Sequence, residues 1–160
     1  MPNWCEGRIK IRGKFSDVVS CIKNSFEGVK HYKGEVLNAP ENISIDDNYI
    51  SDGEFQIFFR DTVHIKNTRR AFVDGDCCII AKNQDSPVIA VIQFKQAWAV
   101  VPENYIEMSK TYNVDIRIQA FECGMEFSQD VIIEKGKITQ DNTIEYDDWG
   151  WDCPVPDWGG

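Results

Sequence analysis

The sequence lacks the features that mark membrane and secreted proteins. None of its apolar runs approaches the roughly 18 consecutive residues that a membrane-spanning helix needs. The first residues, Met-Pro-Asn-Trp-Cys-Glu, contain neither a basic segment nor an apolar core, so they predict no secretory signal. The sequence therefore favours a cytoplasmic protein, located inside a host cell under the leading hypothesis below, with no membrane partner.

The sequence also lacks the spacings that mark metal sites and common active sites. No two of its six cysteines form a C-x-x-C pair, so the usual zinc pattern is missing. The only histidines, His31 and His64, have no neighbouring nucleophile pattern, and no phosphate-binding or hydrolase motif occurs. We therefore expect no metal, no cofactor and no catalytic residue, which favours a protein that is not an enzyme.

Basic residues are scarce compared with acidic ones. The chain has 17 Lys and Arg against 26 Asp and Glu, a formal net charge of −9. Such a charge disfavours direct binding to nucleic acid and to anionic membranes. It does not disfavour basic proteins that themselves bind nucleic acid, so a protein partner is favoured.

The hydrophobic pattern predicts a single α+β domain. Alternating apolar residues predict strands at 8–12, 55–59, 62–66, 77–81, 88–94 and 114–120. Apolar stripes at helical spacing predict one helix after Ser16, which ends before Gly28, and a second that begins at Pro102 and ends at Asn113. This order predicts a ferredoxin-like β-α-β-β-α-β antiparallel sheet with two helices on one face and a C-terminal β-meander.

The chain divides into a folded domain and a distinctive end. Residues 1–140 are predicted to form the ferredoxin-like domain, with an insertion at about 29–60, and residues 141–160 an acidic, Trp-rich C-terminal segment. That segment holds six acids, no base and three of the five tryptophans. Either its tryptophans fold back onto the sheet, or they dock to a partner that the acids attract. Under the second interpretation the partner-binding residues are Asp147, Asp148, Trp149, Trp151, Asp152, Asp157 and Trp158.

One basic cluster interrupts the acidic trend. His64, Lys66, Arg69 and Arg70 surround Asn67 and Thr68. Arg and Lys interleaved with Asn and Thr suit contacts to phosphate, so these four residues are candidates for binding a phosphate or another ligand. The alternative is an internal surface that forms salt bridges with the protein's own acids, and the net charge favours this alternative.

Three stretches carry a resemblance to a known family. The opening Met1 to Glu6 with the strand that follows, the run Phe94-Lys95-Gln96-Ala97-Trp98 followed by Pro102, and the run Glu122 to Phe127 are similar to the Api-ninety-two-like family. Its members are phage- and plasmid-borne proteins described as ferredoxin-like and largely of unknown function. The resemblance implies a mobile-element origin and a fold. It implies no catalytic residue, because the family has none established.

Three functional hypotheses follow. The leading one is a non-enzymatic phage or mobile-element protein that engages or inhibits a host protein, such as a defence or nucleic-acid-handling enzyme, through an acidic surface; its sharpest form is a DNA mimic. The second is a nucleotide or small-molecule binder, or an enzyme, that uses the cluster from Lys66 to Arg70. The third is a homo-oligomeric structural protein. The sequence leaves the partner and the oligomeric state open.

Overall fold

The alternating residues near the N-terminus form a central strand of the molecule. β1 (Trp4–Lys14) buries Cys5, Ile9 and Ile11 on one face and turns Arg8 and Arg12 to solvent on the other. Successive side chains of a strand point to opposite faces, so the alternation in the sequence becomes a division between core and surface.

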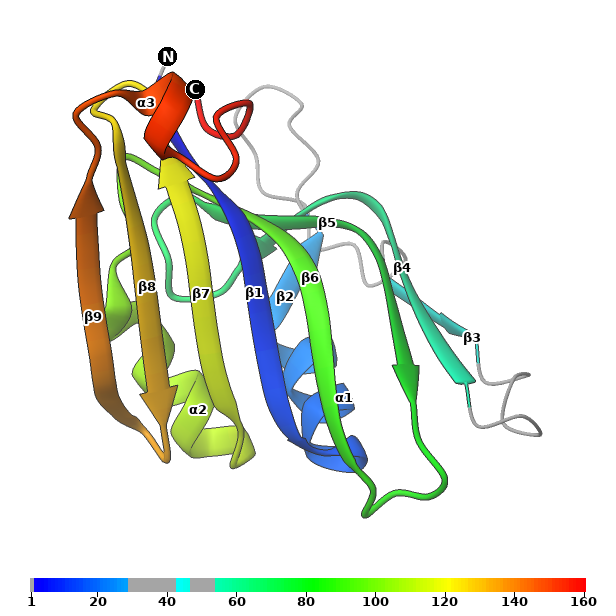
Figure 1. Ribbon diagram of the computed structural model, residues 1–160. Coiled ribbons are helices and arrows are strands. Elements are labelled where there is room, and N and C mark those ends of the chain that lie inside the picture. The colour runs from blue at the N-terminus through cyan, green and yellow to red at the C-terminus, as the bar shows by residue number, and fades with distance from the viewer. Residues whose placement is uncertain (1, 29–42, 47–53) are drawn as a thin grey trace.

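The computed structural model describes residues 2–28, 43–46 and 54–160. In it, β1 belongs to one antiparallel sheet of nine strands (Figure 1). The strand order is β2-β4-β5-β6-β1-β7-β8-β9, and β3 pairs with β4. The further strands are β2 (Phe26–Gly28), β3 (Ile43–Asp46), β4 (Glu54–Ile65), β5 (Ala71–Ile80), β6 (Pro87–Ala97), β7 (Asp115–Glu122), β8 (Phe127–Glu134) and β9 (Lys137–Glu145).

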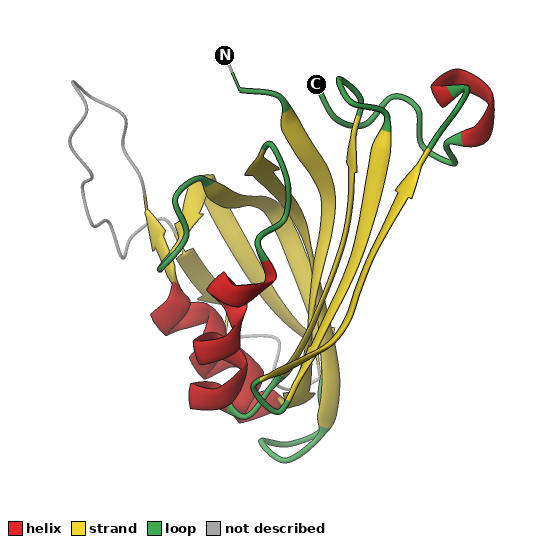
Figure 2. Cartoon of the chain, turned by 90° about the vertical axis from the view of Figure 1, so that its left-hand side faces the viewer, coloured by secondary structure: helices red, strands yellow, loops and turns green. Residues whose placement is uncertain are grey.

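The helices are short, and the two longest cover the same face of the sheet (Figure 2). These are α1 (Phe15–Ser25) and α2 (Ile106–Tyr112), the second of which continues a 3-10 turn, η3 (Pro102–Tyr105). Their apolar stripes pack against the inward side chains of β1, β6 and β7 to form the core. The opposite side of the sheet, called the open face below, carries no helix among the described residues except α3 (Trp149–Asp152) at one end.

A close approach between two strands depends on a glycine. A Cβ atom at Gly7 would collide with the backbone carbonyl oxygen of Gln119 on β7. Because glycine has no Cβ, β1 and β7 can come together at this point, in the centre of the sheet.

The predicted ferredoxin-like fold class is wrong. A β-α-β-β-α-β domain followed by a meander differs from the single nine-stranded sheet that the structure shows. The described part of the predicted insertion at 29–60 belongs to that sheet, because it consists of β3 and the first half of β4. Residues 29–42 and 47–53 lie outside the described residues. β8 and β9 extend the same sheet rather than forming a separate meander. A hydrophobic pattern identifies strands, but it does not say how many of them join one sheet.

Some local predictions are confirmed and others are wrong. Asn113 ends α2 in the left-handed conformation, with a φ of 54°. Ser16 does not cap α1, because the helix already begins at Phe15 and Lys14 occupies the cap position without a side-chain hydrogen bond. Phe26, which the helical stripe includes, lies instead in β2.

The described part of the chain contains no helix that is both long enough and apolar enough to cross a membrane.

Candidate functional site

The C-terminal segment is tied to the N-terminal strand. The backbone of Gly160 exchanges two hydrogen bonds with that of Trp4: the Trp4 N–H donates to the Gly160 oxygen at 3.1 Å, and the Gly160 N–H donates to the Trp4 oxygen at 3.2 Å. The two chain ends therefore lie together at one end of the sheet, beside α3 (Figure 1). Chain ends fray unless such bonds hold them. This segment is fixed at its last residue.

Two of the three tryptophans in this segment anchor it. Trp149 is buried, lies edge-on against Tyr146 at 5.5 Å, and donates its indole N–H to the carbonyl oxygen of Pro156 at 2.9 Å. Trp158 lies edge-on against Phe121 of β7 at 6.0 Å. Each of these two indoles has partners within the protein, which is what the fold-back interpretation predicts for Trp149 and Trp158.

The third tryptophan is held in solvent. The side chain of Trp151 is 86% exposed. It lies on α3, and the side chain of Asp148 caps the first turn of that helix. The carboxylate of Asp148 accepts a hydrogen bond from the backbone N–H of Trp151 at 3.2 Å, and Asp152 accepts one from that of Asp148 at 3.3 Å. Asp147, Asp148 and Asp152 are exposed, and so is Asp157 further along the segment. We call Asp147, Asp148, Trp151 and Asp152 the Trp151 surface.

The basic cluster separates into two pairs with different surroundings. His64 and Lys66 both face Glu27: the distances from its carboxylate are 3.6 Å to His64 Nδ1 and 3.7 Å to Lys66 Nζ. His64 also bonds the carbonyl oxygen of Thr68 through Nε2, at 2.9 Å. These two residues match the internal salt-bridging interpretation.

Arg69 and Arg70 differ from that first pair. Both are exposed, and neither guanidinium pairs with a carboxylate of any described residue. They line a hollow together with Trp98 and Asn104. This pair is what remains of the phosphate-binding hypothesis.

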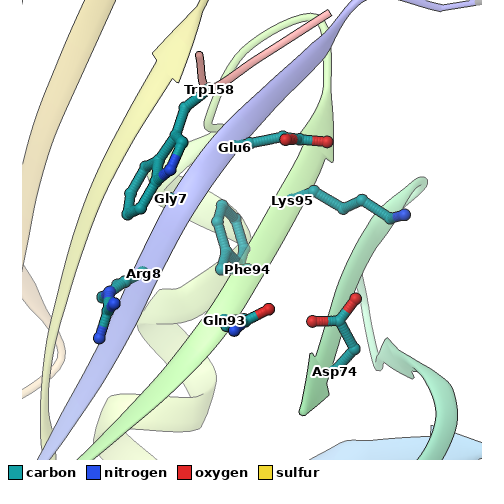
Figure 3. A pocket seen from close by; sticks show the side chains of 8 residues that line it. All are labelled: Glu6, Gly7, Arg8, Asp74, Gln93, Phe94, Lys95 and Trp158. Atoms are coloured by element: carbon teal, nitrogen blue, oxygen red, sulfur yellow. The ribbon is translucent and has the colours of Figure 1, made fainter. Parts of the chain in front are cut away.

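A second hollow, of about 200 Å³, lies on the open face between β1, β5, β6 and the C-terminal segment (Figure 3). Its charged lining residues are two acids, Glu6 and Asp74, and two bases, Arg8 and Lys95. No ion pair joins these four to one another or to any other described residue. Its lining residues are Glu6, Gly7, Arg8, Asp74, Gln93, Phe94, Lys95 and Trp158.

The bases of this second hollow lie against indole rings. The guanidinium of Arg8 lies 5.8 Å from the centre of the Trp158 ring, and the ammonium of Lys95 lies 5.2 Å from that of Trp4. The described lining contains no serine, cysteine or histidine that could act as a nucleophile. The arrangement suits the non-covalent binding of a group that carries both charges.

The buried thiols are not set up for chemistry. Burial, and to a smaller extent the neighbouring Glu122 carboxylate, raise the pKa of the Cys5 thiol to about 12. Burial also raises the pKa of Cys21 to about 12 and that of Cys77 to about 11. A thiol must be ionised to act as a nucleophile or a metal ligand. Among the residues that the structure describes, no group of three or more His, Cys, Asp or Glu could hold a metal ion.

Reasoning from the sequence did not select Trp98, Asn104 or the residues of the second hollow. Trp98 lies between two alanines, without a glycine, proline or polar residue that would signal its turn. Glu6, Arg8 and Lys95 lie on alternating strands, where charged residues usually mark only a solvated face. Their proximity depends on the pairing of β1 with β6, which no local pattern encodes.

Comparison with protein-family models, curated proteins and solved structures finds no match to this chain. No residue role is therefore transferred from a relative. The functional proposals rest on the contacts, charges and exposure of the described residues.

Proposed function

We propose that this chain is a non-enzymatic binding protein of a phage or another mobile element, and that it engages or inhibits a host protein through the Trp151 surface. The observation that carries the proposal is the 86% exposure of Trp151 on a segment that is otherwise anchored. The resemblance of the opening residues to the Api-ninety-two-like family supports the mobile-element origin.

The anchoring gives Trp151 the properties of a binding hot spot. A tryptophan buries about 150–250 Å² in an interface, and tryptophan is enriched among the residues that dominate binding energy. Binding through a preorganised side chain costs less entropy than binding through a mobile one. Trp149 and the cap at Asp148 hold α3 in place, so Trp151 is presented on a fixed support.

The charges around Trp151 define the kind of partner. Asp147, Asp148 and Asp152 are exposed, and residues 141–160 contain no base. A basic surface is the electrostatic complement of such a patch, and charge complementarity raises the association rate and selects the partner. The basic groove of a host nucleic-acid-handling or defence enzyme has this chemistry. If the carboxylates replace phosphates in such a groove, the protein is a DNA mimic and its binding weakens steeply with salt.

The test is an affinity capture from a nuclease-treated lysate of host cells, read by mass spectrometry, with matched variants. We compare the wild type with Trp151→Ala, with Asp147→Asn/Asp152→Asn, and with Ile80→Ala as a control. Ile80 is 71% exposed at the end of β5, so it matches Trp151 as an exposed apolar residue outside the acidic segment.

We expect one basic protein to be captured by the wild type and by Ile80→Ala and to be lost with both other variants. With the purified partner, Trp151→Ala should weaken binding about thirtyfold, which corresponds to a hot spot of about 2 kcal/mol. Raising the salt from about 0.05 M to about 0.5 M should weaken binding further, because the carboxylates are exposed. Equal capture by Trp151→Ala would contradict the proposal. Capture that is insensitive to salt would rule out the DNA-mimic form of the proposal and a role for the acidic residues in binding.

A further inference from the structure

A hollow of about 290 Å³ lies beside the loop that joins β4 and β5, separate from the residues of the Trp151 surface. It lies next to the turn that follows β6, where Ala97 donates its backbone N–H to the carbonyl oxygen of Arg70 at 3.0 Å. We call it the Trp98 hollow. Its lining residues are Arg69, Arg70, Gln96, Ala97, Trp98, Ala99, Val101 and Asn104.

The Trp98 hollow is electropositive in an acidic protein. Arg69 and Arg70 supply two guanidinium groups, and none of the described residues that line it carries a carboxylate. Lys66 of the same loop forms an ion pair with Glu27, whereas these arginines form no ion pair with a described residue. With a net charge of −9, the chain has an excess of acids that could have paired with them. Unpaired guanidinium groups that share a concave surface suit an anion, phosphate above all.

Trp98 gives the hollow an aromatic wall at a cost in backbone strain. Its indole is 60% exposed, and its φ is 71°, which is a left-handed conformation that bulky residues rarely adopt. The Ala99 N–H donates to the Ala97 oxygen at 2.9 Å across it, which forms a strained γ-turn. The Trp98 N–H donates to the Asn3 oxygen at 2.8 Å and helps to hold the turn. Strain of this kind concentrates at binding sites.

A buried amide supplies a further polar group. Gln96 is only 3% exposed, and its Oε1 accepts a hydrogen bond from the Tyr105 hydroxyl at 2.8 Å. Its Nε2 has no acceptor among the described residues, and Gln96 lines the hollow. A buried donor without a partner is unusual in a folded protein, because leaving it unbonded is costly. A ligand oxygen in the hollow would satisfy it.

We propose that the Trp98 hollow binds a nucleoside monophosphate, with its base against the Trp98 indole and its phosphate between Arg69 and Arg70. Aromatic side chains stack on bases whatever their sequence, and paired arginines recognise phosphate. The volume of about 290 Å³ lies just below the range of about 300–1,000 Å³ that is usual for ligand pockets, which suits a ligand as small as one nucleotide. The acidic surface elsewhere repels a longer polynucleotide, so the free nucleotide is the favoured source of this chemistry.

The test is calorimetric titration of the intact chain with AMP, GMP, CMP and UMP, together with three comparison ligands. Inorganic phosphate lacks the base, adenosine lacks the phosphate, and a short single-stranded oligonucleotide carries both within a polymer. The variants are Arg69→Ala/Arg70→Ala and Trp98→Gly. Glycine tolerates the positive φ, so the second variant removes the indole without disturbing the turn. Lys66→Ala is the control, because it removes a positive charge from the same loop without touching the hollow.

We expect at least one monophosphate to bind at least tenfold more tightly than phosphate or adenosine. Its affinity should fall at least tenfold in Arg69→Ala/Arg70→Ala and in Trp98→Gly, and should stay within twofold in Lys66→Ala. Tighter binding of the oligonucleotide would overturn the free nucleotide as the ligand. The site itself is overturned if no monophosphate binds at millimolar concentration, or if both variants bind as the wild type does. A variant that fails to fold is detected by its circular dichroism, and Arg69→Lys/Arg70→Lys then replaces the double alanine variant, with the same tenfold loss expected because lysine cannot form paired bonds to phosphate.

Discussion

The exposed indoles Trp98 and Trp151 lie in surroundings of opposite charge. Trp98 lies beside Arg69 and Arg70, which pair with no carboxylate of a described residue, in a hollow with no carboxylate among its described lining. Trp151 lies on a capped helix among three exposed aspartates. The same side chain therefore lies on two surfaces whose neighbouring charges suit ligands of opposite charge.

The charges of a sequence segment alone do not locate a binding site, because contacts within the fold occupy some of them. His64, Lys66, Arg69 and Arg70 form one basic cluster in the sequence. In the fold, Glu27 contacts both His64 and Lys66, whereas Arg69 and Arg70 pair with no carboxylate of a described residue. Likewise, three tryptophans lie close together in the acidic segment, but Trp149 and Trp158 are used within the fold. What the fold leaves without a partner is what remains for binding.

The largest expected effect separates the anchoring tryptophan from the exposed one. Trp149→Ala should lower the free energy of unfolding by about 3 kcal/mol, because it removes a buried ring and leaves the Pro156 carbonyl without its donor. Trp151→Ala should change it by less than about 0.5 kcal/mol, as exposed substitutions usually do. Urea denaturation of both variants measures the difference. Equal losses would show that Trp151, like Trp149, has a structural role.

Arg117 and Asp130 form an ion pair between neighbouring strands of the sheet. Two hydrogen bonds from Arg117 lower the pKa of Asp130 below its usual value. A lowered pKa in the folded state contributes stability above the ordinary carboxyl pKa of about 4, and this stability is lost as the pH falls through the folded value. Asp130→Asn should therefore cost about 1 kcal/mol at neutral pH and less below pH 4.

The measurement for Asp130 is chemical denaturation of the wild type and of Asp130→Asn at several pH values from about 7 to about 3. Because the chain contains many other acids, only the difference between the two proteins reports on this pair. A difference that does not shrink on acidification would show that the interaction between Arg117 and Asp130 makes no net contribution.

The strained turn at Trp98 should tolerate glycine with little change in stability. Trp98→Gly relieves a positive φ that costs an L residue roughly 1–2 kcal/mol, but glycine makes the unfolded chain more flexible by a comparable amount. We expect the free energy of unfolding to stay within about 1 kcal/mol of the wild type, as measured by thermal and urea denaturation. A loss of several kcal/mol would mean that the indole supports the fold, and Trp98 would then match Trp149 rather than Trp151.

The smallest expected effect lies within the basic loop. Lys66→Ala should lower the free energy of unfolding by up to about 0.5 kcal/mol, since the ion pair with Glu27 is partly exposed. Arg69→Ala/Arg70→Ala should leave stability unchanged or raise it slightly, because these neighbouring like charges have no carboxylate partner among the described residues. Parallel urea titrations give both values. A larger loss for the arginine pair would indicate partners within the protein.

Local structure could be predicted from the sequence where a short-range pattern determines it. The alternation in β1, the helical stripe of α1 and the left-handed Asn113 each depend on a few neighbouring residues. The predicted fold class is wrong because β4, β8 and β9 join one sheet, and no short-range pattern in the sequence encodes which strands belong to the same sheet. β5 shows the same limit: its first half, from Ala71, has no clear alternation, and it is a strand because it pairs with β4 and β6.

The candidate sites could be predicted only in part. The acidic segment and the basic loop are visible as composition, which is why the sequence already singles out Trp151, Arg69 and Arg70. Trp158 contacts Phe121 and Lys66 contacts Glu27, and both partners lie far away along the chain. The sequence alone therefore does not show that Trp158 and Lys66 are used within the fold while Trp151, Arg69 and Arg70 are exposed. The exposed indole of Trp98 depends on hydrogen bonds from its turn to Asn3 and Arg70, so no local signal marks it.

The most direct test of the central claim measures both surfaces on the same two variants. Nucleoside monophosphate affinity and capture of the host protein are measured for Trp98→Gly and for Trp151→Ala. We expect Trp98→Gly to lose the nucleotide and keep the protein partner, and Trp151→Ala to do the reverse. If either substitution abolishes both activities, or neither, the exposed indoles do not define two independent binding surfaces of opposite charge.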